Sequence, residues 1–276
     1  MDKRNPDIKI MIATHKAYQM PDDELYLPLH VGAEGKKDEQ GNVLDLGYQK
    51  DNIGDHISDK NSRFCELTGL YWAWKNLDYD YLGLVHYRRY FSVRKKGKNL
   101  FQNILTYQEA KVLLRKHDII VPKKRKYYIE SLYSHYSHTH YAEHLDETRK
   151  IIYEKYPNYI ETFDKVIQQR YGYMFNMMIM RKDLMDSYCQ WLFDILFELE
   201  SRMEVDGLSA FQERFCGRVA EIIFNVWLAY QLESGKVKKD DVLEIPFIHM
   251  EKIRWGRKIL LFLRAKFVHK KYDRSF

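Results

Sequence analysis

Short apolar runs alternate along the chain with longer segments in which apolar residues recur at helical spacing. The apolar runs predict buried strands at 8–13, 81–85, 117–122, 174–180 and 243–249. The helical spacing predicts helices at 64–77, 107–116, 141–170, 183–203 and 210–232. Strands that alternate with helices are typical of an α/β fold with a mostly parallel central sheet. We therefore predict that fold class, with a helical C-terminal part.

Two regions depart from this alternation. Residues 32–62 are rich in Gly, Asp, Asn and Lys and predict a long irregular loop, which in a compact domain is commonly functional. Residues 251–276 interleave basic and apolar side chains. The predicted organisation is one domain over 1–250, followed by a basic amphipathic tail over 251–276.

Polar and basic residues directly follow three of the predicted strands. These clusters are Thr-His-Lys at 14–16, His-Tyr-Arg-Arg at 86–89 and Lys-Lys-Arg-Lys at 123–126. In open α/β sheets, ligands bind outside the carboxyl ends of the strands. We therefore expect the three clusters to form one rim of cations and histidines that suits an anionic ligand.

The cluster at 86–89 carries the strongest candidate chemistry. Arginine can bind phosphate oxygens through two charge-assisted hydrogen bonds. If the strand continued, alternation would point His86 and Arg88 to one side and Tyr87 and Arg89 to the other. The alternative is structural: one arginine is a buried ion-pair partner and His86 is an internally satisfied hydrogen-bonding group.

Composition excludes several classes of protein. Hydrophobic residues make up 45% of the chain and charged residues 30%, as in globular proteins. The 3 cysteines are far apart and form no CxxC pair, so we expect neither disulfides nor a cysteine zinc site. The polar start predicts no signal peptide, and no apolar run reaches the roughly 18 residues of a spanning helix.

The positive charge is concentrated at one end of the chain. Residues 252–276 hold nine Lys and Arg and one Asp, an excess larger than the net charge of +6 of the whole chain. A nucleic-acid-binding protein should carry its basic patch on the fold itself, so no nucleic-acid partner is expected. The pattern suits a helix lying on an anionic membrane surface. The alternative is a helix packed on the domain.

Several longer segments spread over nearly the whole chain carry a family resemblance. They are ATHKAYQMPDDELYLPLHVGA (13–33), DNIGDHISDKNSRFCELTGLYWAWKNL (51–77), DYLGLVHYRRYF (80–91), DIIVPKKRKY (118–127), FNMMIMRKDLMDSYCQWLFDILFELE (175–200) and RVAEIIFNVWL (218–228). Together they resemble a bacterial family of capsular and exopolysaccharide glycosyltransferases. That family was long catalogued as a domain of unknown function and includes galactofuranosyltransferases.

The resemblance implies a GT-A-like nucleotide-sugar-binding fold and a UDP-sugar-dependent enzyme. The expected reaction moves a sugar, with galactofuranose a candidate, from a UDP-sugar to a lipid-linked oligosaccharide, with inversion at the anomeric carbon. The expected location is cytoplasmic, peripherally at the inner face of the cytoplasmic membrane. The alternative is a non-catalytic component of the same machinery that binds a sugar nucleotide or a glycan.

One motif departs from the wider GT-A pattern. In those enzymes the strand equivalent to 81–85 usually ends in an Asp-x-Asp motif that holds a metal on the diphosphate, whereas His86-Tyr87-Arg88 stands here. Arginine supplies positive charge directly, and the leaving group needs electrostatic stabilisation from either source. The need for a divalent metal stays open, a metal-independent site is favoured, and no metal ligands are assigned.

Candidate site residues fall into a catalytic and a binding set. His86 and Arg88 are expected to act on the diphosphate. Glu221 is expected to take the acceptor's proton; Asp146 and Glu213 are alternatives, and a surface ion pair between Glu221 and Arg218 is the structural one. Small and amide residues of the loop suit uracil or ribose. The residues expected to bind the nucleotide sugar are Thr14, His15, Lys16, Asp51, Asn52, Asp55, Asn61, Glu66, Arg89, Lys123, His140, Asn176 and Arg218.

The chain also contains a dense set of histidines. His135, His138, His140 and His144 lie within one segment, and the last two have the i,i+4 spacing of helical metal ligands. No HExxH motif accompanies them, so a zinc hydrolase is not favoured. The simplest interpretation of most of these side chains is polar surface.

Overall fold

The computed structural model describes residues 5–94 and 99–251 and divides into two compact units. Unit 1 contains Met1–Lys123, Asn176–Cys189 and Val237–Met250. Unit 2 contains Lys124–Phe175, Gln190–Lys236 and Glu251 among the described residues. The single domain predicted over 1–250 is thus built from two units. Most of the predicted tail, 252–276, lies outside the described residues.

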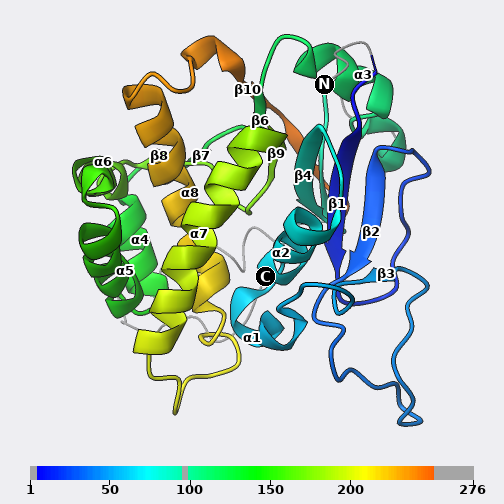
Figure 1. Cartoon of the computed structure of the whole chain (residues 1–276), viewed down its shortest axis with the longest axis horizontal. Helices are drawn as coiled ribbons and strands as arrows, with labels where there is room; N and C mark the ends of the chain where they lie inside the picture. Colours follow the sequence, from blue (N-terminus) through cyan, green and yellow to red (C-terminus); the bar gives the residue numbers. More distant parts are fainter. Residues whose placement is uncertain (1–4, 95–98, 252–276) are drawn as a thin grey trace. The chain divides into compact units, whose positions relative to one another are not determined.

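Unit 1 is built on one mixed but mostly parallel sheet, in the order β10-β6-β9-β4-β1-β2-β3, with β5 and β11 attached beside β4 (Figure 1). The pairs β1–β2, β1–β4, β2–β3 and β6–β10 are parallel, whereas β9 is antiparallel to both of its neighbours. This confirms the predicted α/β fold class. The strands are β1 Ile8–Thr14, β2 Tyr26–His30, β3 Gln49–Lys50, β4 Tyr81–His86, β5 Arg89–Phe91, β6 Ile119–Pro122, β9 Met178–Arg181, β10 Val242–Ile245 and β11 Phe247–His249.

The central strands form because they are buried on both faces. Ile10, Met11 and Ile12 of β1 and Leu82 and Leu84 of β4 have no exposed surface. Burial of each such side chain stabilises the fold by about 1.5–3 kcal/mol. Continuous apolar runs are the sequence pattern of such strands, which is why β1 and β4 were predictable.

Helices of unit 1 lie close to this sheet. They are α1 Asn61–Phe64, α2 Leu67–Asn76, α3 Tyr107–Leu114 and the first part of α7 Lys182–Arg202. Gly69 of α2 permits close approach, because a Cβ there would stand 2.7 Å from Met11 Sδ and 2.9 Å from Leu29 Cδ2. The helix predicted over 64–77 is divided in two, since the backbone at Cys65 has φ 54° and ψ −129°.

Unit 2 is mainly helical. Its elements are β7 Arg125–Lys126, α4 Leu132–Thr139, α5 Glu143–Lys155, α6 Ile160–Ile167, β8 Tyr171–Gly172, the second part of α7 and α8 Phe215–Glu233. The helix predicted over 141–170 is interrupted by the 3-10 helix Pro157–Tyr159 between α5 and α6. The buried residues of α8 span most of its length, so α8 is the central helix of this unit.

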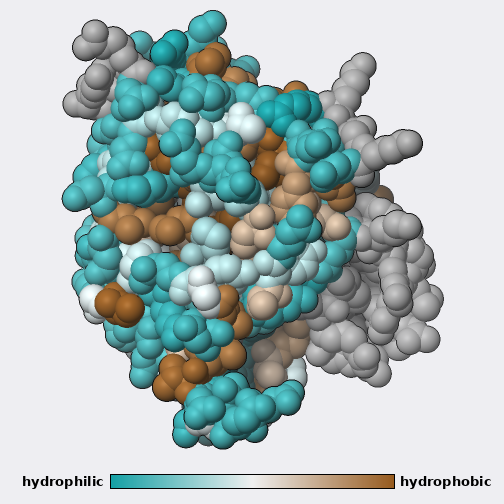
Figure 2. Space-filling model, turned by 90° about the vertical axis from the view of Figure 1, so that its right-hand side faces the viewer, coloured by the Kyte–Doolittle hydropathy of each residue, from teal (hydrophilic) through white to brown (hydrophobic). Residues whose placement is uncertain are grey.

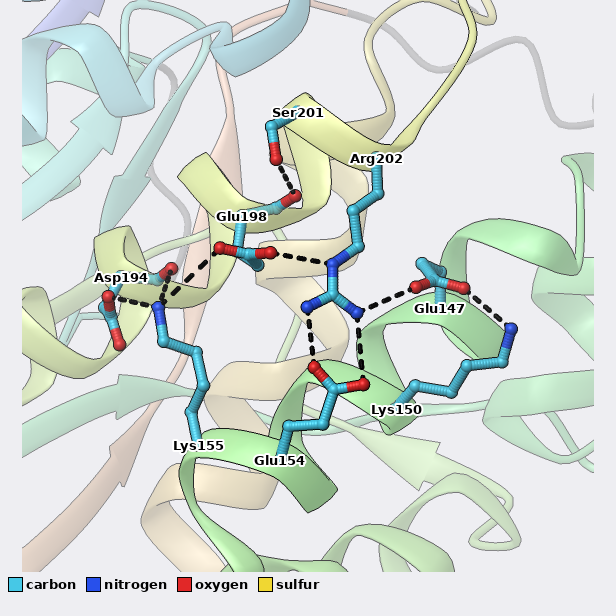
Figure 3. A network of polar contacts seen from close by, with 8 residues as sticks. All are labelled: Glu147, Lys150, Glu154, Lys155, Asp194, Glu198, Ser201 and Arg202. Carbon is cyan, nitrogen blue, oxygen red and sulfur yellow. Dashed lines mark hydrogen bonds and ion pairs between the residues drawn. The ribbon is translucent and has the colours of Figure 1, made fainter.

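A network of ion pairs joins α5 to the second part of α7 (Figure 3). The guanidinium of Arg202 contacts Glu154 at 2.6 Å, Glu198 at 2.8 Å and Glu147 at 3.1 Å. In the same network, the Lys155 ammonium contacts the Asp194 carboxylate at 2.6 Å. Isolated surface pairs contribute little, but a guanidinium shared by three carboxylates fixes the register of the two helices.

The surface is mixed in character. On the face that Figure 2 presents, hydrophobic residues form small groups among hydrophilic ones. Within residues 5–94 and 99–251, no helix combines the length and the apolar composition that crossing a membrane requires.

Gly83 of β4 offers a test of the central packing. A Cβ at this position would stand 2.9 Å from the backbone oxygen of Met178 on β9 and 3.0 Å from Ile179 Cγ1. Because a paired backbone cannot move aside cheaply, we expect Gly83→Ala to lower the free energy of unfolding by about 1–3 kcal/mol in urea denaturation. Ser62→Ala, at an exposed position of α1, is the control and should change it by less than about 0.5 kcal/mol. Equal stability of Gly83→Ala and wild type would contradict this packing.

Candidate functional site

The end of β4 turns back on itself as a tight hairpin. His86 pairs with Arg89 of antiparallel β5, which leaves Tyr87 and Arg88 as the two turn residues. The expectation that His86 and Arg88 point to one side of a continuing strand is therefore wrong. β11 fastens the hairpin from the other side, and Met250 N donates to Arg88 O at 2.9 Å.

Parallel pairing brings the hairpin to the end of β1. Ala13 is in register with His86, and Tyr87 N donates to Ala13 O at 3.3 Å. The strand ends at 14–16 and 86–89 consequently lie side by side, which places two of the three predicted clusters together at the carboxyl edge of the sheet.

Cations and aromatic rings gather around the buried ring of Tyr87. The Lys16 ammonium lies 5.2 Å from its centroid and the Arg88 guanidinium 5.1 Å. The rings of Tyr18 and His15 meet it edge-on at 4.9 and 5.5 Å. We call these five residues the Tyr87 cluster. Cations over a tyrosine face are held electrostatically by the ring, so the cluster presents positive charge from a fixed base.

The third predicted cluster is divided between the units. β6 runs parallel to β4 with antiparallel β9 between them, so Lys123 follows β6 at the same edge as the Tyr87 cluster. Two strand spacings separate β6 from β4, roughly 10 Å. Lys124 belongs to unit 2, where its ammonium lies 4.9 Å from the ring of Tyr173. Of the four residues of this cluster, only Lys123 belongs to unit 1, where it directly follows β6.

One carboxylate stands at this otherwise cationic edge. Glu66 Oε1 accepts a hydrogen bond from Asn176 Nδ2 at 2.7 Å and lies 3.9 Å from His86 Nε2. Only 11% of the Glu66 side chain is exposed. Asn176 precedes β9, whose antiparallel direction starts it at the carboxyl edge of β4. Three predicted site residues are thus in one place.

Backbone strain surrounds Glu66. Cys65, the preceding residue, has φ 54°, while Phe175 and Asn176 have φ 75° and 49°. Each such conformation costs about 1–3 kcal/mol for a non-glycine residue and persists only where surrounding contacts hold it. Strain of this kind concentrates at functional sites, so it supports the assignment of Glu66 and Asn176 to the site.

Asp51 has an internal role. Its carboxylate is fully buried and accepts hydrogen bonds from the backbone N–H groups of Gly32 and Ala33 at 2.8 and 3.0 Å. It also accepts from the hydroxyls of Thr68, at 2.6 Å, and Ser58. All of these partners are internal, so Asp51 holds the loop and is not placed to touch a nucleotide.

Two further predicted contacts belong to the framework. Asn61 donates to Cys65 O at 2.7 Å and to Thr68 Oγ1 at 3.1 Å. Thr14 is buried, and its hydroxyl donates to Lys16 O at 2.7 Å, which shapes the turn that carries Lys16. These side chains position the edge instead of facing a ligand.

Asn52 and Asp55 lie on the outer part of the loop. Asn52 Nδ2 donates to Glu34 Oε2 at 3.0 Å. The carboxylate of exposed Asp55 accepts from the Tyr71 hydroxyl at 3.1 Å, and burial together with this bond raises the pKa of Tyr71.

The remaining predicted residues lie in unit 2. The Arg218 guanidinium stacks 4.0 Å from the ring of Phe211 and donates to the backbone oxygen of the same residue. His140 Nδ1 lies 3.2 Å from Gln212 Oε1, and burial, then the charge of Arg218, lowers the His140 pKa to about 2. His140 is therefore a neutral ring.

Glu221 shares α8 with Arg218 as predicted, and its side chain is half-buried. Asn225, one turn further along α8, is buried; its Oδ1 accepts from Tyr173 N at 2.7 Å and its Nδ2 donates to Tyr173 O at 2.9 Å. Asp146, one alternative base, is exposed and accepts from the Tyr133 hydroxyl at 2.9 Å.

Sequence reasoning missed Tyr18 and Tyr87 as members of the site. Tyr87 lies inside the predicted cluster, yet its position in a turn was hidden by the apparent continuation of the strand. Tyr18 follows β1 by four residues and has no motif of its own. Within residues 5–94 and 99–251, no three His, Cys, Asp or Glu side chains gather as a metal site.

Comparison with known proteins adds two findings. A family model described as a domain of unknown function, DUF4422, matches residues 9–232. The structure is also similar to a solved structure titled as the apo form of the bifunctional glycosyltransferase WbbM, with a TM-score of 0.79 and 28% sequence identity. The similarity covers 89% of this chain and 46% of that one, so the chain spans about half of WbbM. No curated protein matches the chain.

Asp51→Asn tests the internal role of this carboxylate. An amide nitrogen cannot accept a hydrogen bond, so at least one buried donor loses its partner. We expect the free energy of unfolding to fall by about 2–3 kcal/mol in urea denaturation. Asp55→Asn is the matched control at an exposed position of the same loop and should cost less than about 1 kcal/mol. The opposite order of the two variants would refute the assignment.

Proposed function

The chain belongs to the DUF4422 family, and from this membership and the Tyr87 cluster we propose that the protein is a glycosyltransferase that uses a UDP-sugar donor. Its similarity to WbbM, described as a bifunctional glycosyltransferase, supports the general activity. The UDP-sugar is supported by the sequence resemblance and by the charge of the sheet edge.

The observation that carries the proposal is the pair of cations on one tyrosine ring. Lys16 follows β1 and Arg88 follows β4, and both cations lie about 5 Å from the centroid of the Tyr87 ring. Two like charges so near a common group repel each other, and a bound anion relieves that repulsion. A diphosphate carries the required charge and several acceptor oxygens for a guanidinium fork.

In the proposed reaction, an acceptor hydroxyl attacks the anomeric carbon of the donor sugar. The bond from that carbon to the β-phosphate oxygen breaks, and UDP leaves with the electron pair. Lys16, Arg88 and Arg89 neutralise the charge that develops on the diphosphate, which is electrostatic stabilisation of the leaving group. His86 completes the hairpin beside them.

Glu221 is the residue that we propose to take the proton of the acceptor hydroxyl. Its support comes from its place on α8 one turn after Arg218, whose charge favours the ionised carboxylate. While the carboxylate takes the proton, the acceptor oxygen attacks the anomeric carbon from the face opposite to the leaving group, and this single displacement gives inversion.

Arginine is proposed to do what a metal does in related enzymes. The sequence resemblance supports this, because it sets His86-Tyr87-Arg88 where an Asp-x-Asp motif is expected, and the Arg88 guanidinium at the Tyr87 ring supplies charge without a metal ligand set. The proposed site therefore binds the diphosphate without a divalent ion.

The proposed acceptor is a lipid-linked glycan intermediate of a cell-surface polysaccharide, and the proposed sugar is galactofuranose. Both are supported by the sequence resemblance. We propose that the protein works at the inner face of the cytoplasmic membrane. The basic segment that would dock there, 252–276, lies outside the described residues.

Incubation of the purified protein with a panel of UDP-sugars and a lipid-linked acceptor tests the activity. We expect transfer from at least one donor. Arg88→Ala should weaken UDP binding in calorimetry by about 10- to 100-fold, because a charge-assisted hydrogen bond is lost. Arg88→Lys should restore only part of it, since an ammonium lacks the fork. Arg115→Ala, at an exposed arginine that follows α3, is the control and should bind UDP as wild type does.

Absence of transfer from every donor, together with equal UDP binding by Arg88→Ala and wild type, would reject the proposal. UDP binding without turnover would instead favour the alternative, a non-catalytic binding component. In that case Glu221→Gln would leave the activity of the whole polysaccharide-synthesising machinery unchanged.

A further inference from the structure

A buried carboxylate in unit 2 holds two histidine rings. Glu130 Oε2 lies 2.8 Å from His135 Nδ1, and Oε1 lies 2.7 Å from His138 Nδ1. Only 2% of the Glu130 side chain is exposed. The two histidines are three residues apart on α4, so they share a face of that helix. Ser131, next to Glu130, caps the same helix, which fixes the carboxylate relative to both rings.

The protonation of this cluster is determined by its contacts. Burial raises the pKa of Glu130, but the hydrogen bonds from His135 and His138 outweigh burial and bring the pKa to about 2. An ionised carboxylate only accepts, so both Nδ1 atoms carry hydrogens. Burial lowers the pKa of His135, which Glu130 offsets only in part, so that ring is neutral at pH 7.

His138 is the member of this cluster that reaches the surface. Its Nδ1 contacts Glu130, and Nε2 is the ring nitrogen that can hydrogen-bond to a hydroxyl group, which both donates and accepts. The His138 side chain is 34% exposed, whereas the carboxylate that contacts it is buried. His138 is therefore a hydrogen-bonding ring that is held in place and reaches solvent.

Exposed apolar side chains lie on β8 and in the segment that follows β7. Tyr128, Ile129 and Tyr171 are among the exposed large hydrophobic residues, and Tyr128 is 76% exposed. We call these three residues the ribbon patch. The backbone of Tyr128 has φ 58°, a conformation that is uncommon for a bulky residue.

The ribbon patch is tied to the histidine cluster through the backbone. β7 pairs with β8, with Lys126 in register with Tyr171. Arg170 Nη1 donates to Tyr128 O at 3.2 Å, and the ring of Tyr127 packs 4.4 Å from that of His135. The patch and the cluster are consequently parts of one surface of unit 2.

These features together match the chemistry of a sugar chain. A sugar ring offers a C–H face, which packs on a tyrosine ring, and hydroxyl groups, which hydrogen-bond to an imidazole nitrogen. An acyl chain or an apolar protein segment would gain nothing from a polar ring that is held in place near the patch.

We propose that the ribbon patch and His138 form a subsite for the saccharide part of the acceptor. This inference rests on the proposed function, because a glycosyltransferase acceptor is the saccharide in question. It assigns recognition of the acceptor saccharide to unit 2, with Tyr128 as the stacking residue and His138 as the hydrogen-bonding partner of a sugar hydroxyl.

His138→Asn separates this role from a structural one. The amide nitrogen of Asn reproduces the Nδ1 donor to Glu130 but supplies no hydrogen-bonding atom at the position of Nε2. We expect unchanged stability and UDP affinity, and a rise of about three- to tenfold in the KM for the acceptor, the value of one ordinary hydrogen bond. Tyr128→Ala should raise the same KM. Tyr153→Ala, at a tyrosine of α5 that is 63% exposed, is the matched control and should leave it unchanged.

A second measurement needs no turnover. Titration with methyl β-D-galactoside, methyl β-D-glucoside and methyl α-D-mannoside, followed by ¹H–¹⁵N NMR of the imidazole rings, should shift His138 Nε2 for at least one glycoside. His117, on unit 1, should not shift. If UDP binding fails while His138 responds, the proposed function is rejected and the saccharide subsite stands.

Unchanged acceptor KM in both His138→Asn and Tyr128→Ala, with no glycoside response, would overturn the subsite while UDP binding and transfer remain intact. Soluble and lipid-linked acceptors distinguish the source of binding. An equal rise in KM for both supports saccharide recognition, and a rise for the lipid-linked acceptor alone would show that the surface binds lipid, which contradicts the proposal.

Discussion

Parallel pairing of β1 with β4 is the constraint on which the candidate site depends. Its register sets Ala13 against His86, so the residues that follow both strands emerge together at one edge. This brings Lys16 and Arg88 to the ring of Tyr87. The charge is held by the buried sheet beneath it and does not depend on flexible side chains meeting by chance. A shift of the register would separate the cations.

The loop beside this edge is held by equally specific contacts. Asp51 gathers two backbone donors and two hydroxyls inside the protein. Beyond it, Glu66 is fixed by Asn176, with strained backbone at Cys65 and Asn176. The energy that these conformations cost is repaid by the packing around them, so the site is assembled before any ligand binds.

The sequence predicted the central strands, which are continuous buried runs, and missed the short or irregular strands β2 and β3. β1, β4 and β6 are continuous apolar runs. β2 contains Pro28, and a proline usually argues against a strand. In the structure Pro28 is in register with Ile12 of β1, while β3 pairs only with Leu29 and His30 of β2. α4 was missed because its serines and histidines give it no apolar face, whereas in the structure it is held by caps and by Glu130.

Individual site residues were harder to assign than the edge that carries them. A polar loop residue looks the same in sequence whether it faces a ligand or the interior. This is why the sequence predicts Asp51 and Asn61 as ligand contacts. Tyr87 could not be recognised as the centre of the cluster, because only the hairpin geometry reveals it. The division of the basic run between Lys123 and Lys124 likewise depends on long-range packing.

The central claim is that arginine and lysine at the Tyr87 cluster receive the diphosphate in place of a metal ion. The most direct measurement is a crystal structure with UDP and Mn²⁺ present, with anomalous scattering recorded for manganese. The account predicts diphosphate oxygens within hydrogen-bond distance of Arg88 and Lys16, with no manganese peak on the diphosphate. A manganese ion between protein and diphosphate, or UDP bound away from the Tyr87 cluster, would contradict it.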